Sequence, residues 1–293
     1  MNSTSVRGAI ATLSAVAVCL WTTAPSVSAR AQAPSLATIL GTAGSYVSQL
    51  GKDLDGVVFE EDYFQQAQGQ ALVARRLKSD IAVLSDNAVG WVEFRDTTSV
   101  DGKPVRDRQA RIADIFTKPD GNALEQARRI VREGARFNIE AVGLKIDRTI
   151  NLPMAALAFL RAENQRRSTF TPDRSDVFSG RTVAIRFKET AKPRMIGTVD
   201  DAAAQGVFWI VPETGRVTRT ELTIETRRGS SLVSASIGVE YGLIPSLNLW
   251  LPKTMDEWYQ ATTGSQMAGA ITGHAVYENF RKFNVAVEEK AAQ

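Results

Sequence analysis

Cysteine and histidine are almost absent from this 293-residue chain, which contains one of each. Counting alone excludes cysteine-rich zinc sites, centres built from several histidines and disulfide frameworks. We therefore expect no metal site and no cofactor. The lone histidine, His274, has no catalytic or metal-binding partner nearby along the chain, so the sequence assigns no catalytic residue.

Catalytic signatures are also absent. The chain has no Gly-x-Ser-x-Gly elbow, and Gly229-Ser230-Ser231 is better interpreted as a turn. Gly51-Lys52 lacks both the earlier glycine and the following Ser or Thr of a phosphate-binding loop. An exported hydrolase using His274 remains the least favoured function, because a catalytic triad is assembled in space and not along the sequence.

Long hydrophobic runs are missing as well. The longest uncharged apolar run, Ala9 to Trp21, is shorter than the roughly 18 to 20 residues that a membrane-spanning helix needs. It follows Arg7 and precedes the small residues Ser26-Val27-Ser28-Ala29. This order is typical of a secretory signal peptide, so residues 1–29 are predicted to be one.

The cleavage position stays open between residues 29 and 33, because Ala31-Gln32-Ala33 offers a second site. Cys19 lies inside the predicted signal, and Val18 before it disfavours a lipoprotein signal. The mature chain is then free of cysteine and is predicted to be periplasmic or otherwise exported.

Neither sign of charge dominates the chain as a whole. There are 35 Lys and Arg against 32 Asp and Glu, with 44% apolar and 23% charged residues. These values exclude collagen-like, disordered and coiled-coil proteins. Without an internal repeat or an interdomain linker, residues 34–290 are expected to form a single domain, and a monomer is expected.

Three helices are predicted. Apolar residues at three- and four-residue steps from Leu36 to Leu54 predict an amphipathic helix, weakened by Gly41 and Gly44. Its polar face carries Ser and Thr, so we expect it to cover the core and not a membrane surface. A second helix is expected after Asn122 and a third over 152–161.

Strands are predicted wherever apolar residues alternate with polar ones. Asp101-Gly102 between two such runs is a strong hairpin signal, and the short turns elsewhere imply antiparallel pairing. The predicted strands cover residues 57–64, 71–84, 91–100, 105–116, 182–189, 206–211, 216–225, 231–241, 249–259 and 274–287.

These elements favour an α+β fold with a strongly curved antiparallel sheet. A sheet of about 10–12 strands has to bend, close or be covered. We expect a strongly bent sheet whose concave face receives about three helices, with an apolar pocket between the two layers.

Three neighbouring acids lie in the first predicted strand. Alternation places Glu61 on one face with Val57, Phe59 and Tyr63, whereas Glu60 and Asp62 share the other face. A cation site needs such carboxylates together, so a solvated strand edge is favoured.

The segment from Gly206 to Leu222 has the pattern strand, tight turn, strand. Trp209 and Ile210 supply bulk, and Pro212 and Gly215 form the turn. This segment resembles a hairpin of the outer-membrane lipoprotein-sorting (LolA-like) superfamily of periplasmic carriers. Mycobacterial lipoprotein lipid carriers and anti-sigma-factor regulators also belong to that superfamily.

The order of the predicted elements and the closing segment 277–283 are further similarities to this superfamily. Shorter stretches are similar to exported bacterial proteins of unassigned function: 91–96, 100–106 and 148–153. The resemblance implies an incomplete barrel with helices as a lid over a hydrophobic cavity. No ligand-contacting residue carries over, because the matching segments are scaffold.

Bulky apolar residues are the candidates for lining such a cavity, with core packing as the commoner alternative. They are Trp91, Phe94, Trp209, Trp250, Leu157 and Leu160.

Residues 101–200 hold 20 Lys and Arg against 13 Asp and Glu. This surplus includes Arg128, Arg129, Arg132 and Arg136, which form a candidate surface for an anionic membrane or an acidic partner. A solvated helix face is the favoured alternative. Nucleic acid is disfavoured by the predicted export signal.

The leading hypothesis is a non-catalytic periplasmic carrier or chaperone. Its partner would be a hydrophobic ligand, either a lipid or the acyl chain of a lipoprotein. The alternative is an envelope protein–protein interaction module with a filled core, distinguished by the lack of a cavity of roughly 300 Å³.

Overall fold

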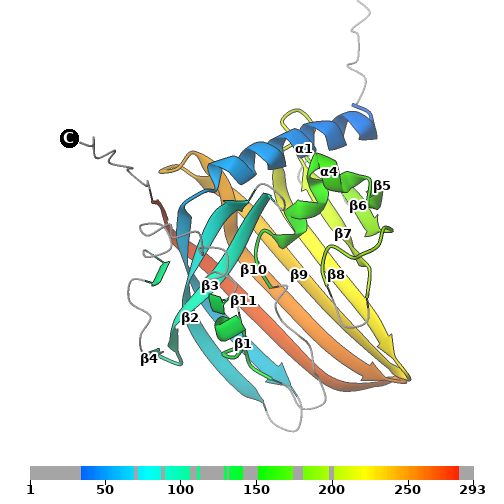
Figure 1. Cartoon of the computed structure of the whole chain (residues 1–293). Coiled ribbons are helices and arrows are strands. Elements are labelled where there is room, and N and C mark those ends of the chain that lie inside the picture. The colour runs from blue at the N-terminus through cyan, green and yellow to red at the C-terminus, as the bar shows by residue number, and fades with distance from the viewer. Residues whose placement is uncertain are drawn as a thin grey trace, which may run out of the picture. The chain divides into compact units, whose positions relative to one another are not determined.

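Alternation of apolar and polar residues produces a single antiparallel sheet in the computed structural model (Figure 1). The structure describes residues 34–68, 72–86, 90–105, 111–112, 129–130, 132–140, 151–173, 181–197 and 201–283, so the predicted signal peptide lies outside the described residues. Within these ranges the sheet has eleven strands and is not closed. The strands are β1 (Val57–Gln68), β2 (Val73–Asp86), β3 (Gly90–Val100), β4 (Lys103–Pro104), β5 (Ser168–Asp173), β6 (Val183–Glu189), β7 (Ala204–Ile210), β8 (Val217–Arg228), β9 (Ser231–Ile244), β10 (Leu249–Thr263) and β11 (Gln266–Lys282).

The first and last long strands meet in the middle of the sheet. The strand order is β4-β3-β2-β1-β11-β10-β9-β8-β7-β6-β5. Pairing of β1 with β11 runs from Val57 opposite Lys282 to Gln68 opposite Ala270. The sheet therefore consists of two meanders joined along β1 and β11, with β4 and β5 as its edges.

The hairpin predicted at Asp101-Gly102 is confirmed. Both residues have positive φ, 49° and 77°, and Val100 pairs with Lys103 across them. A two-residue loop with positive φ at both positions matches the twist of the flanking strands.

The strand predicted over 105–116 is wrong where the structure describes it, because Arg111 and Ile112 are helical. A short apolar run does not by itself distinguish a strand from a buried helical turn. The last predicted strand was placed too late: β11 starts at Gln266.

Helix α1 (Leu36–Asp53) confirms the first predicted helix. Its N-cap residue Ser35 accepts a hydrogen bond from the Thr38 backbone N–H at 3.1 Å, which satisfies one of the free donors of the first turn. The third predicted helix is a 3₁₀ helix, η1 (Ala155–Leu160), followed by the single turn α4 (Ala162–Gln165). In Figure 1, α1 crosses one end of the strands, and α4 lies beside it.

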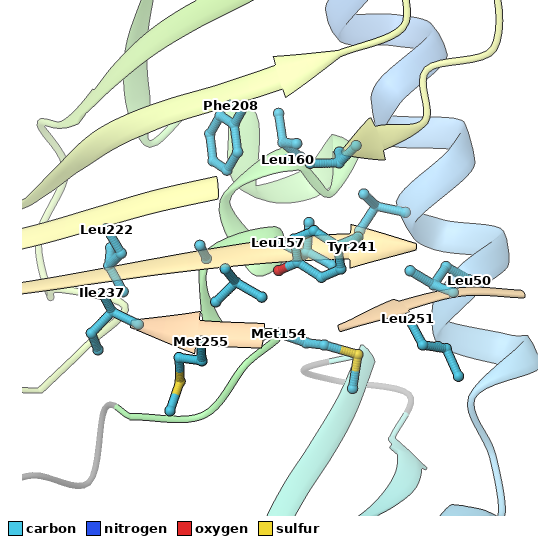
Figure 2. Packing of buried hydrophobic residues seen from close by; sticks show 14 of the residues in the cluster. Leu50, Met154, Leu157, Leu160, Phe208, Leu222, Ile237, Tyr241, Leu251 and Met255 are labelled. Carbon is cyan, nitrogen blue, oxygen red and sulfur yellow. The ribbon is translucent and has the colours of Figure 1, made fainter. Parts of the chain in front are cut away.

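The sheet has an inner face, which carries Phe59 and Tyr63, and an outer face opposite to it. The inner face forms one core with Leu50 of α1 and Leu157 of η1. Figure 2 shows the buried side chains of the two helices gathered against those of the strands.

The second predicted helix is helical in its described parts, 129–130 and 132–135. Its Ile130 packs with Val58, Ala82 and Phe94 in a separate cluster. Val58 is the neighbour of Phe59 in β1, so its side chain points to the outer face. This helical segment therefore covers the outer face. The expectation that all helices cover the concave face is wrong for this helix.

The two glycines of α1 have different roles. A Cβ at Gly44 would lie 2.8 Å from Gln165 Nε2 and 3.2 Å from the Leu160 carbonyl oxygen, whereas a Cβ at Gly41 would meet nothing within 4 Å. We expect Gly44→Ala to destabilise the protein by about 1–3 kcal/mol. Gly41→Ala should stabilise it by up to about 1 kcal/mol through helix propensity. Urea denaturation checks both values; equal effects of the two changes would contradict the close packing of α1.

Candidate functional site

The apolar part of the inner face lies beneath α1 and η1. Leu157 and Leu160 of η1 are 1% and 0% exposed and belong to the inner-face core together with Trp91. Trp250 packs against the same core and is half-buried, with the Arg216 guanidinium 4.2 Å from its ring centre. The structure thus brings four of the six predicted cavity residues to the inner face.

Phe94 and Trp209 differ from this expectation, because both are buried on the outer face. Phe94 packs with Ile130, and Trp209 packs with Ala184 and Val207 beneath the Arg219 guanidinium, 4.7 Å from its ring. Strand alternation explains the position of Phe94: β3 turns Glu93 and Arg95 inward, and Phe94 between them must point outward.

The predicted basic surface is described in part. Arg129, Arg132 and Arg136 are exposed, and the Arg136 guanidinium lies 5.1 Å from the Phe137 ring centre. Arg128 lies outside the described residues. Binding of an anionic membrane by this surface stays a prediction.

The polar part of the inner face contains a buried ion pair. Arg95 donates from Nε and Nη2 to the two carboxylate oxygens of Glu61, at 2.6 and 2.8 Å. It also donates to the Asn151 side-chain and backbone oxygens, at 3.0 and 2.8 Å. The guanidinium lies 5.2 Å from the Tyr63 ring centre. All three guanidinium nitrogens are thus engaged by the protein, as a buried charge requires.

Glu93 is the second buried carboxyl of this region. Both of its oxygens lie 3.2 Å from the Met154 backbone nitrogen, which donates to them. Burial raises the pKa of Glu93 to about 8, against the opposing effects of the Met154 hydrogen bond and the Arg95 charge. The carboxyl is therefore predominantly protonated at neutral pH.

These groups hold the chain that enters η1. The Tyr241 hydroxyl donates to the Pro153 carbonyl oxygen at 2.7 Å, next to the residue that Glu93 binds. We name Glu61, Glu93, Arg95 and Asn151 the inner polar cluster. Its contacts tie residues 151–154 to strands β1 and β3, which is a positioning role for the helical layer.

The sequence interpretation did not identify this cluster, although it contained two signals. Alternation placed Glu61 on the face of Phe59 and Tyr63, and the structure confirms this placement. Glu93 and Arg95 lie inside segment 91–96, and Asn151 lies inside segment 148–153, both selected for their resemblance. The sequence does not show how β1, β2 and β3 pair. In the structure β2 lies between β1 and β3, with Glu61 opposite Ser79 and Arg95 opposite Ile81.

The outer face carries the remaining candidates. Asp62 forms an ion pair with Arg76 at 2.6 Å and Glu60 lies 3.6 Å from Arg281, so the three neighbouring acids are split as predicted. His274 Nδ1 lies 2.7 Å from Asp256 Oδ1, a partner far away along the sequence.

Two general properties follow from the described residues. None of their helices combines the length and apolar character that a membrane span requires. Within the same part of the chain, no group of three or more His, Cys, Asp or Glu side chains is placed to hold a metal ion.

No family model and no curated protein matches the sequence. Among solved structures, the chain is similar to a domain described as an outer membrane lipoprotein-sorting protein from Vibrio parahaemolyticus. The identity is 14%, the match covers 84% of this chain and 94% of that chain, and the TM-score is 0.39. A DUF1329 family protein from Desulfovibrio piger is 8% identical over 85% of this chain and 94% of that chain, with a TM-score of 0.34.

Lipovitellin is also similar, at 10% identity over 82% of this chain and 27% of that chain, with a TM-score of 0.28. The lipoprotein-sorting superfamily that the hairpin residues resemble is thus represented among the similar structures. Because these TM-scores are below 0.5, the similarity does not indicate a function. A function can be inferred only from the residues of this chain.

Proposed function

We propose that this chain is a non-catalytic, exported carrier or chaperone that holds a lipid or a lipoprotein acyl chain between the inner face and the helices α1 and η1. One observation supports this proposal. The apolar inner face belongs to an unclosed sheet, and its cover consists of helices that take no part in the strand hydrogen bonding. The cover can then move while the sheet keeps all of its hydrogen bonds.

The free energy of apolar burial favours replacement of the helix contacts by a ligand. Burying an acyl chain is worth about 0.8 kcal/mol per methylene group, so a long chain can replace the contacts that η1 makes. The inner-face core includes Met154 and Met255, and methionine adapts to irregular apolar surfaces. A sheet of eleven strands that bends around this region would form the trough for the ligand.

Side-chain hydrogen bonds also connect α4 with α1 and η1, and α1 with the sheet. Gln165 Nε2 donates to the carbonyl oxygens of Leu40 in α1 and Leu160 in η1, at 2.8 and 2.7 Å. Ser85 Oγ of β2 donates to the Gly51 carbonyl oxygen at 2.9 Å. In the proposed function these contacts break when the ligand enters.

The direct test uses the purified mature protein. Its bound lipids are extracted and identified by mass spectrometry, and a dansyl-labelled fatty acid is titrated while its fluorescence is recorded. The proposal expects co-purified lipid or saturable binding of the probe. A protein that yields no lipid and does not bind the probe would exclude the carrier function.

A second experiment addresses the movement of the cover. Gln165→Ala removes the hydrogen bonds from α4 to α1 and to η1 and should lower the free energy of unfolding by about 1–2 kcal/mol. Because the cover then opens more often, stopped-flow fluorescence should show faster uptake of the fatty acid. Gln49→Ala is the control, since Gln49 bonds only to Asp53 on the exposed side of α1. Unchanged uptake in Gln165→Ala would contradict opening through α1 and η1.

An interaction module with a filled core is the second candidate. The ring contacts of Phe159 with Phe187 and of Phe187 with Phe208 favour it, because the ring centres lie 4.9 and 4.7 Å apart and pack η1 closely against the sheet. If the protein is such a module, the fatty acid does not bind, and the protein acts by binding a partner at its surface.

A further inference from the structure

The outer face has an exposed aromatic patch, which we define as Phe64, His274, Asp256 and Trp258. The side chains of Phe64 and Trp258 are 42% and 55% exposed. Phe64 pairs with His274, and His274 pairs with Asp256, across β1, β11 and β10. Trp258 follows two residues after Asp256 and therefore lies on the same face. The Nδ1–Oδ1 contact of 2.7 Å joins the His274 imidazole to the Asp256 carboxylate.

A polar groove of about 430 Å³ lies on the same face over β5 to β8. Hydroxyl, amide and charged groups line it, so it offers both donors and acceptors. Its cations are largely offset: Arg186 pairs with Asp173 at 2.5 Å and Arg219 with Glu221 at 2.6 Å. The polar lining residues are Thr169, Thr171, Arg186, Lys188, Gln205, Glu221 and Thr223.

Gly238 joins the patch to the groove. In the strand register it lies between Asp256 of β10 and Glu221 of β8. A Cβ at this position would meet only Glu221 Cγ, at 4.0 Å. No side chain therefore separates the two features in this row. Three strand spacings, about 14 Å, lead from His274 to Glu221.

We propose that this outer-face row binds an oligosaccharide, with a sugar ring stacked on Trp258 and further residues of the glycan lying over Gly238 into the groove. The indole presents a flat apolar surface to the apolar face of a sugar ring. The His274–Asp256 pair and the groove hydroxyls supply the directed hydrogen bonds that its hydroxyl groups need. Balanced charge in the groove suits a neutral, hydroxyl-rich chain.

A protein partner fits the same surface less well. Stable protein interfaces bury about 800 Å² on each side around an apolar centre. Here the patch holds two exposed aromatic residues and the hydrophilic pair His274–Asp256, and so offers no extended apolar centre. The oligosaccharide site is independent of the carrier function, because it uses the opposite face of the sheet.

The test measures binding of defined glycans to the mature protein. Maltohexaose, cellohexaose and chitohexaose are titrated by calorimetry, and soluble polysaccharides are screened by affinity electrophoresis. We expect at least one of them to bind, with an affinity at least tenfold weaker in Trp258→Ala. Leu243→Ala, which truncates another exposed apolar side chain on β9 (47% exposed), should bind like the wild type.

Gly238→Val is the more specific variant. A β-branched residue suits a strand, so thermal unfolding should show an unchanged or higher midpoint while glycan binding is lost. Absence of binding to every glycan would overturn the proposal, as would equal binding by the wild type and both outer-face variants. A protein partner that requires Trp258 in the absence of glycan binding would also overturn it. Dansyl fatty acid binding, measured in parallel, tests the carrier function separately.

Discussion

Replacing Arg95 with methionine is expected to lower the free energy of unfolding by about 3–5 kcal/mol, because Glu61 would remain as a buried carboxylate without its partner. The side chains of Arg95 and Glu61 are 8% and 0% exposed. The same change removes the donors to Asn151, so the segment that leads into η1 also loses support. Urea denaturation near pH 7 measures the effect.

Two comparisons make this expectation specific. The double variant Arg95→Met and Glu61→Leu should recover part of the loss, because replacing both buried charges by apolar groups is often neutral. Arg76→Met is the matched control: Arg76 pairs with Asp62 at 2.6 Å, but its side chain is 63% exposed. Such a pair is worth about 0–1 kcal/mol. A similar loss in Arg76→Met and Arg95→Met would contradict the role of burial.

The second large effect concerns pH. Burial raises the pKa of Glu93 to about 8 in the folded protein, whereas an unfolded glutamate titrates near 4.3. Between these values the folded state holds a proton that the unfolded state has released. The free energy of unfolding should therefore fall as pH rises from about 5 to 8, by at most about 1.4 kcal/mol per pH unit from this group.

Glu93→Gln removes this titration and keeps an oxygen that accepts the Met154 hydrogen bond. Denaturation series from pH 5 to 9 should therefore show a flatter profile for Glu93→Gln than for the wild type. A residual slope is expected from Asp96, because burial raises its pKa to about 6. Glu240→Gln, an exposed position on β9, controls for the change in net charge. Identical slopes in wild type and Glu93→Gln would refute the assignment.

Local signals determined which elements could be predicted. Helix α1 and the Asp101-Gly102 hairpin follow from residues close together in sequence, and both were predicted correctly. The strands from β6 to β10 were also placed within a few residues of their bounds, whereas β5 was not predicted and β11 was placed too late. Periodicity and turn residues act over a few positions, so a single sequence is sufficient to recognise them.

The candidate site could be predicted only in part, because it depends on which face of a strand is turned inward. The segment from Trp91 to Thr97 has six of its seven residues buried, so hydrophobicity does not identify its inner face. The expectation for Phe94 failed for this reason. Arg95 and Glu61 are 34 residues apart, and only the pairing of three strands reveals that they form an ion pair.

The meeting of β1 and β11 has a consequence for how the protein forms. Residues 57–68 pair with residues within 266–282. This part of the sheet can therefore form only when synthesis of the chain is almost complete. Contacts between such distant residues slow folding. A chain that ends before Gln266 would retain two separate meanders, each with an unprotected long strand, and we expect such fragments to aggregate.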